Sequence, residues 1–85
     1  LDLMASRRER LWQAGLEKLR IRFAERGGLL TPEQRLAALA GLTPISRSGD
    51  GVLRIGARTR NDAKNAREYY HDDLAAVFGA VAVEP

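Results

Sequence analysis

Cationic side chains recur along one face of a segment that is expected to be helical, over residues 59–78. They lie at intervals of three and four residues, the spacing that puts side chains on one side of a helix, at Arg60, Lys64, Arg67 and His71. Arg58 stands just before them. Aligned cations can follow the phosphates of a nucleic acid; the alternative is a solvated face that keeps a small domain in solution. The pattern predicts nucleic-acid contacts at Arg58, Arg60, Lys64 and Arg67 and leaves the solvated-face interpretation open.

The acidic residues of the same segment are poorly placed for acid–base catalysis. Asp72 and Asp73 are adjacent, so on a helix they point about 100° apart and cannot act as a facing pair. Glu68 and Asp72 share a face beside His71, but surface carboxylates of this kind are ordinarily just solvated. The chain has no cysteine and one histidine, which removes thiolate and multi-histidine metal sites. We therefore expect no catalytic residue, no bound metal and no cofactor.

The only tryptophan lies in an apolar stripe near the start of the chain. The stripe has steps of four, three and four residues, at Trp12, Leu16, Leu19 and Phe23. This spacing predicts a helix over about residues 6–26 that Gly27 should end, because glycine enters the left-handed cap conformation without a steric cost. Trp12 is either a core side chain or an exposed anchor, since tryptophan is enriched at interface hot spots. Trp12 and Leu16 are the predicted self-association residues.

Turn and cap residues divide the rest of the chain into five further elements. Thr31 is a good N-cap and Pro32 suits a first helical turn, which predicts a short second helix that ends near Gly41. Residues 42–45 and 52–57 read as the strands of a hairpin, with Pro44 indicating an edge strand. A third helix is expected over residues 59–78 and a last strand over 81–83.

The resulting order, α-α-β-β-α-β, predicts an α+β fold in which helices pack on a small three-stranded sheet. A length of 85 residues suits one domain, so residues 1–85 are expected to form a single interaction domain. Because residue 1 is not methionine, we expect this domain to be part of a longer protein. The chain has no run of the ~20 apolar residues that span a bilayer and no signal-peptide pattern, so a cytoplasmic protein without membrane contacts is expected.

Two stretches resemble the amino-terminal, KH-like domain of the bacterial replication initiator DnaA. Leu11–Leu19 has its Leu-Trp opening followed by leucine-spaced residues, and Gly51–Phe78 is similar to its later half. Within that half, Leu53–Ile55 matches an apolar strand, Arg60 a basic residue after it, and Arg67–Tyr70 a helix centre. The resemblance implies a non-enzymatic protein–protein interaction domain of a DNA-replication protein that self-associates through its tryptophan-bearing helix.

The chain departs from that family in two places. Its connection between the first helix and the Val52 strand is longer, chiefly around residues 26–30. The family often has an aromatic residue at the strand-to-helix corner, in contact with the replicative helicase, where this chain has Asn61. Glu33 corresponds to the acidic helicase contact on the family's second helix. The resemblance thus implies partner binding at Glu33 and Asn61, without the aromatic half of the contact.

Two alternatives remain beside this interpretation. The ending Val77–Val81 resembles the carboxy-terminal, polymerase-docking domain of the clamp-loader tau subunit. The glycine loop at residues 55–59 and the cations after it are compatible with a small KH-like module for single-stranded nucleic acid. The expected function is a protein–protein interaction and weak self-association module of a bacterial, plasmid or phage replication protein. Its expected partners are other replication proteins, including the replicative helicase, with weak single-stranded DNA binding as a second property.

Overall fold

Glycine and threonine set the boundary between the first two helices. The computed structural model describes residues 3–85, and their side chains from residue 7 onward. Helix α1 (Leu3–Arg26) ends where Gly27 takes a φ of 66° and its N–H donates to the Phe23 carbonyl at 3.2 Å. Helix α2 (Pro32–Ala38) follows Thr31, whose Oγ1 accepts the Gln34 N–H at 3.1 Å. The predicted boundaries at Gly27 and Thr31 are confirmed, and α1 begins three residues earlier than predicted.

A three-stranded mixed sheet follows the two helices. Strands β1 (Leu42–Arg47) and β2 (Leu53–Ala57) form the predicted antiparallel hairpin. Strand β3 (Val81–Glu84) pairs in parallel with β2, which is therefore the central strand. Pro44 lies on the edge strand β1, where the pairing register shifts before Ser46. An edge position suits proline because it has no N–H to donate to a second neighbour.

The helix predicted over residues 59–78 is two helices in the structure. Helix α3 covers Arg60–Tyr69 and helix α4 covers His71–Phe78. Between them, Tyr70 leaves the helical conformation with φ −126° and ψ 3°. Its buried ring packs edge-on against Phe23 of α1, with ring centroids 5.8 Å apart, so the residue at the break is part of the core. The element order is therefore α-α-β-β-α-α-β. The predicted order α-α-β-β-α-β was wrong in one respect, because it joined α3 and α4 into a single helix.

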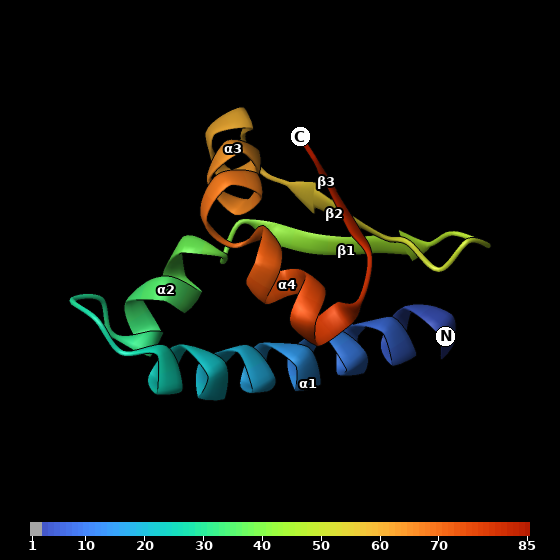
Figure 1. Ribbon diagram of the computed structural model, residues 1–85. Coiled ribbons are helices and arrows are strands. Elements are labelled where there is room, and N and C mark those ends of the chain that lie inside the picture. The colour runs from blue at the N-terminus through green and yellow to red at the C-terminus, as the bar shows by residue number, and fades with distance from the viewer. Residues whose placement is uncertain (1–2) are drawn as a thin grey trace.

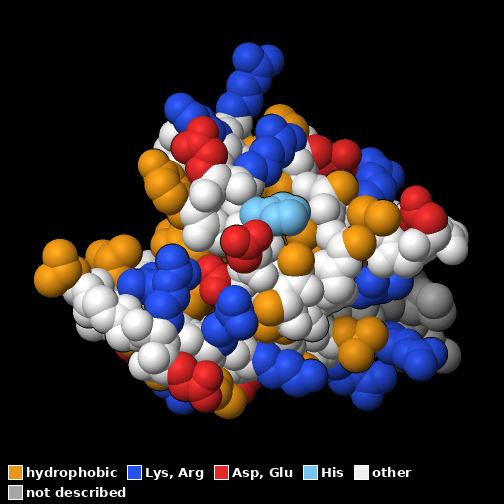
Figure 2. Space-filling model, viewed as in Figure 1, with side chains coloured by type: hydrophobic (Ala, Val, Ile, Leu, Met, Phe, Trp, Pro, Cys, Tyr) orange, Lys and Arg blue, Asp and Glu red, His pale blue; other side chains and the backbone are white. Residues whose placement is uncertain are grey.

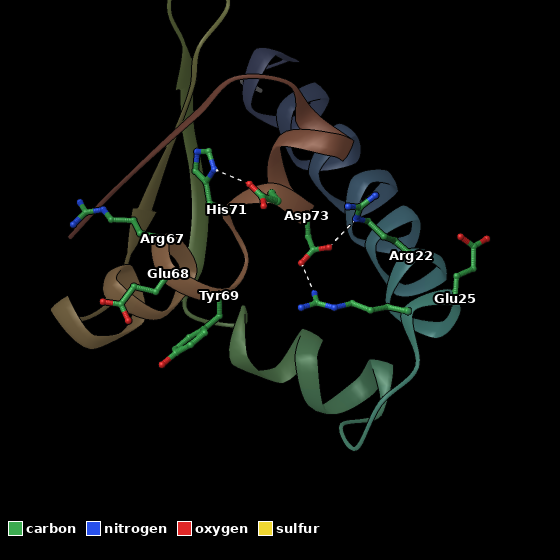
Figure 3. Close-up of a pocket in the computed structure, with 9 residues that line it drawn as sticks. Arg22, Glu25, Arg67, Glu68, Tyr69, His71 and Asp73 are labelled. Atoms are coloured by element: carbon green, nitrogen blue, oxygen red, sulfur yellow. Dashed lines mark hydrogen bonds and ion pairs between the residues drawn. The ribbon is translucent and has the colours of Figure 1, made fainter.

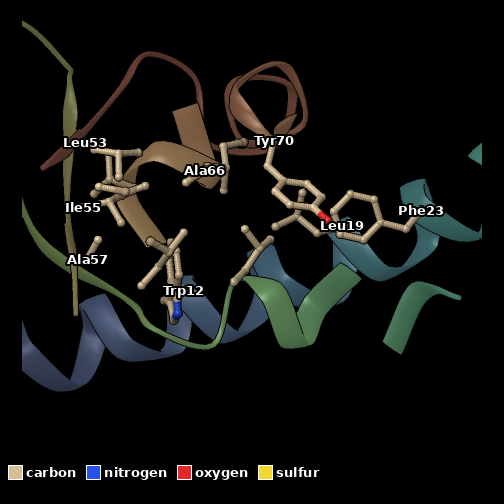
Figure 4. Packing of buried hydrophobic residues seen from close by; sticks show 13 residues of the cluster. Trp12, Leu19, Phe23, Leu53, Ile55, Ala57, Ala66 and Tyr70 are labelled. Carbon is tan, nitrogen blue, oxygen red and sulfur yellow. The ribbon is translucent and has the colours of Figure 1, made fainter. Parts of the chain in front are cut away.

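One apolar core joins the helices to the sheet. Helix α4 lies between α1 and the sheet, and α2 lies near the carboxyl-terminal end of α1 (Figure 1). Leu19 of α1, Ile55 of β2 and Leu74 of α4 are completely buried, and Trp12 and Phe23 extend the core along α1 (Figure 4). The described residues thus form a small α+β fold with four helices and three strands, as predicted for the class. None of these helices is long and apolar enough to cross a membrane.

Candidate functional site

A groove of about 500 Å³ lies between α1, α2 and β1. We call it the acidic groove, because its described lining contains two carboxylates and no cation. The lining residues are Glu9, Trp12, Gln13, Leu16, Glu17, Leu36, Leu39, Ala40, Leu42, Thr43 and Pro44. The groove exists because two short elements, α2 and β1, pack against neighbouring stretches of the much longer α1.

The floor of the acidic groove is apolar and belongs to the core. Leu39 and Leu42 are buried there, and Pro44 is buried beside them. Leu16 and Leu36 are only partly buried, so each presents apolar surface at the edge of the groove. Partly exposed leucines above a fixed apolar floor are suited to contact with an apolar partner side chain.

The rim of the acidic groove consists of carboxylates held by neighbouring polar side chains. Glu9 accepts a hydrogen bond from Gln13 Nε2 at 2.9 Å. Arg20 lies 3.3 Å from both Glu17 and Glu33, so it links the rim to the first turn of α2. Two carboxylates therefore share one guanidinium, and Glu9 adds a third carboxylate to this edge of the protein, although the whole chain carries a net charge of +3.

The structure brings three of the four predicted protein-contact residues to the acidic groove. Leu16 lines it, Trp12 forms part of its floor, and Glu33 is joined to its rim through Arg20. Asn61 is exposed on the first turn of α3 and does not line the groove. Trp12 is only 5% exposed, so the structure shows the core side chain of the two interpretations offered for it. Self-association remains a prediction, and in this fold the ring of Trp12 is not an exposed anchor.

The cations predicted to contact nucleic acid do not form one continuous stripe. Arg67 Nε donates to the Val83 carbonyl at 2.8 Å, which ties this side chain to β3. Arg58 Nε lies 3.8 Å from Asp62. Arg60 and Lys64 are exposed, whereas His71 belongs to α4 and not to the helix that carries them. The single helix predicted to carry all four cations is therefore interrupted at Tyr70, before His71.

Charge is also mixed over the surrounding surface. Figure 2 shows Lys and Arg side chains spread along α1 and around α3, with Asp and Glu side chains between them. A mixed surface gives a weaker field than a patch of one sign, and such a field attracts a polyanion weakly. All four predicted cations are exposed, but only Arg60 and Lys64 have no ion-pair or hydrogen-bond partner among the described residues.

A polar cleft of about 560 Å³ between α1, α3 and α4 contains an ion cluster that the sequence did not predict. Arg22 Nε and Arg26 Nη1 donate to the two oxygens of Asp73 at 2.7 and 2.8 Å (Figure 3). The Asp73 side chain is only 5% exposed, whereas each arginine is about half exposed. Because both carboxylate oxygens are engaged by guanidinium groups, the cluster clamps α4 to α1. Among the described residues no three His, Asp or Glu side chains are grouped as metal ligands.

Comparison with known proteins gives no relative for this chain. No protein-family model, no curated protein and no solved structure matches it. The resemblance to the DnaA amino-terminal domain accordingly rests on the residues of Leu11–Leu19 and Gly51–Phe78.

Proposed function

We propose that this domain is a non-enzymatic docking module of a bacterial, plasmid or phage DNA-replication protein and that it binds a partner protein in the acidic groove. The observation that carries the proposal is an apolar floor with a carboxylate rim, which Leu16 lines and which Arg20 links to Glu33. The replication context comes from the sequence resemblance alone.

The composition of the groove defines the partner chemistry. Apolar side chains of the partner would lie on Leu36 and Leu16, which already present partly exposed surface. Lysine or arginine side chains beside them would meet Glu9 and Glu17 on the rim. Complementary rim charges raise the association rate and select among partners, while the apolar contacts supply most of the affinity. The expected ligand is a segment with apolar anchors flanked by basic residues.

Self-association is the second activity that the resemblance implies. Since Trp12 is buried, a second copy would have to contact Leu16 and the rim of the same groove. Self-association and partner binding would then compete for one surface. This competition provides a check, because a bound partner should shift the protein toward the monomer.

Two purified probes test the docking proposal. The first is an amphipathic peptide of leucine and lysine, about 14 residues long, with leucines at the helical spacing of i, i+3, i+4 and i+7. The second is the replicative helicase from the genome that encodes this chain. Binding is measured by isothermal titration calorimetry, and the peptide site is mapped by amide chemical shifts. We expect the shifts to centre on Leu36, Ala40 and Thr43, which line the groove.

A charge-reversal pair identifies the groove. Replacing both Glu9 and Glu17 by lysine should weaken peptide binding about tenfold or more, because the rim then repels the basic segment. The matched control replaces Glu25 and Glu68 by lysine; both are exposed and lie outside the acidic groove. If the wild type binds neither probe, the proposal is wrong. If both double variants lose affinity equally, overall charge and not the groove explains binding, and the site assignment is wrong.

A further inference from the structure

A second groove, of about 400 Å³, lies between the first turns of α1, the β1–β2 hairpin and the end of α4. We call it the basic groove. Trp12 and Pro44 line both this groove and the acidic groove, so these two residues separate them. The described side chains that characterise the basic groove are Arg7, Arg8, Leu11, Arg47 and Phe78.

The apolar wall of the basic groove is fixed before any ligand binds. The Phe78 ring stacks on Trp12, with centroids 5.0 Å apart and planes at 16°. A Cβ added at Gly15 would lie only 2.1 Å from the Phe78 ring, so this ring also rests against the α1 backbone. Leu11 stands at the edge of the groove with 64% of its surface exposed. An aliphatic side chain that enters here meets apolar surface that does not have to rearrange.

Arginines form the rim, and no acidic side chain of the described residues lines the groove. Arg47 is held in place by its Nη1 donating to the Gly51 carbonyl at 2.7 Å and its Nη2 to the Phe78 carbonyl at 3.3 Å. A guanidinium has five N–H donors, so Arg47 keeps donors for a carboxylate while its position is fixed. Neither Arg7 nor Arg8 pairs with a carboxylate within the described part of the chain.

We propose that the basic groove is a second docking site, which binds an acidic amphipathic segment of a partner protein. Aliphatic side chains of that segment lie beside Leu11 and Phe78, and its carboxylates pair with Arg7, Arg8 and Arg47. Arginine and carboxylate match in geometry and form strong two-point hydrogen bonds. The volume falls within the range of about 300–1,000 Å³ that ligand pockets show, which admits anchoring side chains of a helix. This site is separate from the acidic groove and does not rest on the function proposed there.

The same cations could attract a single-stranded nucleic acid, but the groove favours a peptide. Proteins that bind single strands stack the bases on open aromatic faces. Here the two rings of the groove, Trp12 and Phe78, are stacked on each other, and Trp12 is 5% exposed. The surface left for a ligand is that of the exposed Leu11 and the partly buried Phe78, which suits aliphatic side chains.

The test uses two peptides of opposite charge on one protein. One is the leucine–lysine peptide described above, and the other has glutamate in place of every lysine. The leucine–glutamate peptide should shift the amides of Leu11, Arg47 and Phe78, whereas the leucine–lysine peptide should shift those of the acidic groove. Trp12, the single tryptophan, reports on both sites by fluorescence. Each docking site can thus fail without the other.

Two pairs of variants separate the rim from the apolar edge. Replacing Arg7 and Arg8 by glutamate should lower the affinity for the leucine–glutamate peptide about tenfold or more. The matched control replaces Arg10 and Lys18 by glutamate, because both are exposed on the same helix but lie outside the groove. Leu11→Gln should weaken it severalfold. Ile21→Gln should leave it unchanged, because Ile21 is similarly exposed on α1 and does not line the groove.

Three outcomes would overturn the proposal. The first is no binding of the leucine–glutamate peptide at millimolar concentration. The second is binding that the Arg7 and Arg8 replacement leaves unchanged. The third is a labelled oligothymidylate that binds more tightly than the peptide and shows the same dependence on Arg7 and Arg8, which would assign the groove to nucleic acid.

Discussion

The two grooves share Trp12 and Pro44, but the charged side chains that line them have opposite signs. The acidic groove has α2 as its second wall and Glu9 and Glu17 on its rim. The basic groove has the end of α4 as its second wall and arginines on its rim. Apolar floors of this kind discriminate little among partners, whereas rim charges discriminate strongly. One small core can therefore present two docking surfaces whose partners do not exchange.

The difference originates in the way α1 is used. Successive residues of one helix point in different directions, so Arg8 and Glu9 are neighbours in the chain and line different grooves. The core stripe of α1, which includes Trp12, lies between these two directions. A single helix thus supplies the common floor and both rims.

The shared floor gives the largest expected effect. Trp12→Ala removes a buried, stacked ring, and we expect the free energy of unfolding to fall by about 3–5 kcal/mol. Both peptides should lose affinity, because the wall between the grooves is gone. Ile21→Ala, at an exposed position of the same helix, should stay within about 0.5 kcal/mol of the wild type. Chemical denaturation measures the free energy of unfolding, and calorimetry measures the affinity for each peptide.

Sedimentation of the same variant tests the interface interpretation of Trp12. A variant that keeps the stability of the wild type and loses a dimer would place the ring at an interface and contradict its burial in the core. A wild type that stays monomeric at millimolar concentration would instead show that the self-association prediction is wrong.

The second prediction concerns α4, which lines the basic groove but not the acidic groove. Asp73→Asn weakens the clamp to Arg22 and Arg26, and we expect a loss of about 1–3 kcal/mol, because the half-exposed arginines can be rehydrated. The leucine–glutamate peptide should bind more weakly, since α4 carries Phe78. The leucine–lysine peptide should bind the folded protein as before, because no α4 residue lines the acidic groove.

Asp72→Asn is the matched control for this clamp, because the neighbouring Asp72 side chain is fully exposed. It should leave stability and both affinities unchanged. Equal weakening of the two peptides by Asp73→Asn would show that the grooves are not independent.

Local sequence signals predicted where several elements begin and end. They did not predict the break between α3 and α4. Gly27 and Pro44 act through their own backbone preferences, and Thr31 acts through the hydroxyl that caps α2. Each of these signals can be recognised in the sequence. The apolar spacing of Ala66, Tyr70 and Leu74 continues through the break, so periodicity indicates one helix. Tyr70 packs against Phe23 of α1 at the break, and the spacing of residues in the sequence contains no signal for such a tertiary contact.

The same distinction holds for the sites. Leu16 belongs to a helix stripe that is visible in the sequence, and the structure places it in the lining of the acidic groove, while its role in binding stays a prediction. The Asp73 clamp joins residues 47 and 51 positions apart, and adjacent aspartates in sequence suggest only a solvated pair. The basic groove likewise combines α1 with the hairpin and α4, and only the fold brings Arg7 near Phe78.

The third prediction asks whether α3 is a competing cationic surface. Replacing Arg60 and Lys64 by glutamate should reduce any single-stranded DNA affinity and flatten its salt dependence by about 0.7 per lost phosphate contact. Neither peptide should change affinity, since these residues line neither groove. Fluorescence anisotropy at two salt concentrations measures the affinity for single-stranded DNA and its salt dependence. Weaker binding of the leucine–glutamate peptide would show that general charge attraction, and not the basic groove, recognises it.

Arg67 serves as the contrast in that experiment. Its guanidinium donates to the Val83 carbonyl, so Arg67→Glu should lower the free energy of unfolding by about 1–2 kcal/mol, whereas exposed Arg60→Glu should change it by less than about 0.5 kcal/mol. Unchanged stability in Arg67→Glu would contradict a structural role for this arginine.

The smallest expected effect lies in the hairpin turn that holds Arg47. Hydrogen bonds from the Ser48 hydroxyl and the Val52 N–H lower the pKa of Asp50 below its ordinary value. Because the folded pKa is lower than the unfolded one, this contribution to turn stability is complete at neutral pH and is lost as the pH falls through the folded pKa. Arg47 donates to the Gly51 carbonyl in the same turn. At neutral pH Asp50→Asn should therefore lower the affinity for the leucine–glutamate peptide slightly and leave the affinity for the leucine–lysine peptide unchanged.

An NMR titration of the Val52 amide should show a midpoint below that of an ordinary aspartate in the wild type and no such transition in Asp50→Asn. A midpoint at the ordinary aspartate value, or an equal effect on the two peptides, would contradict the link between the turn and the basic groove.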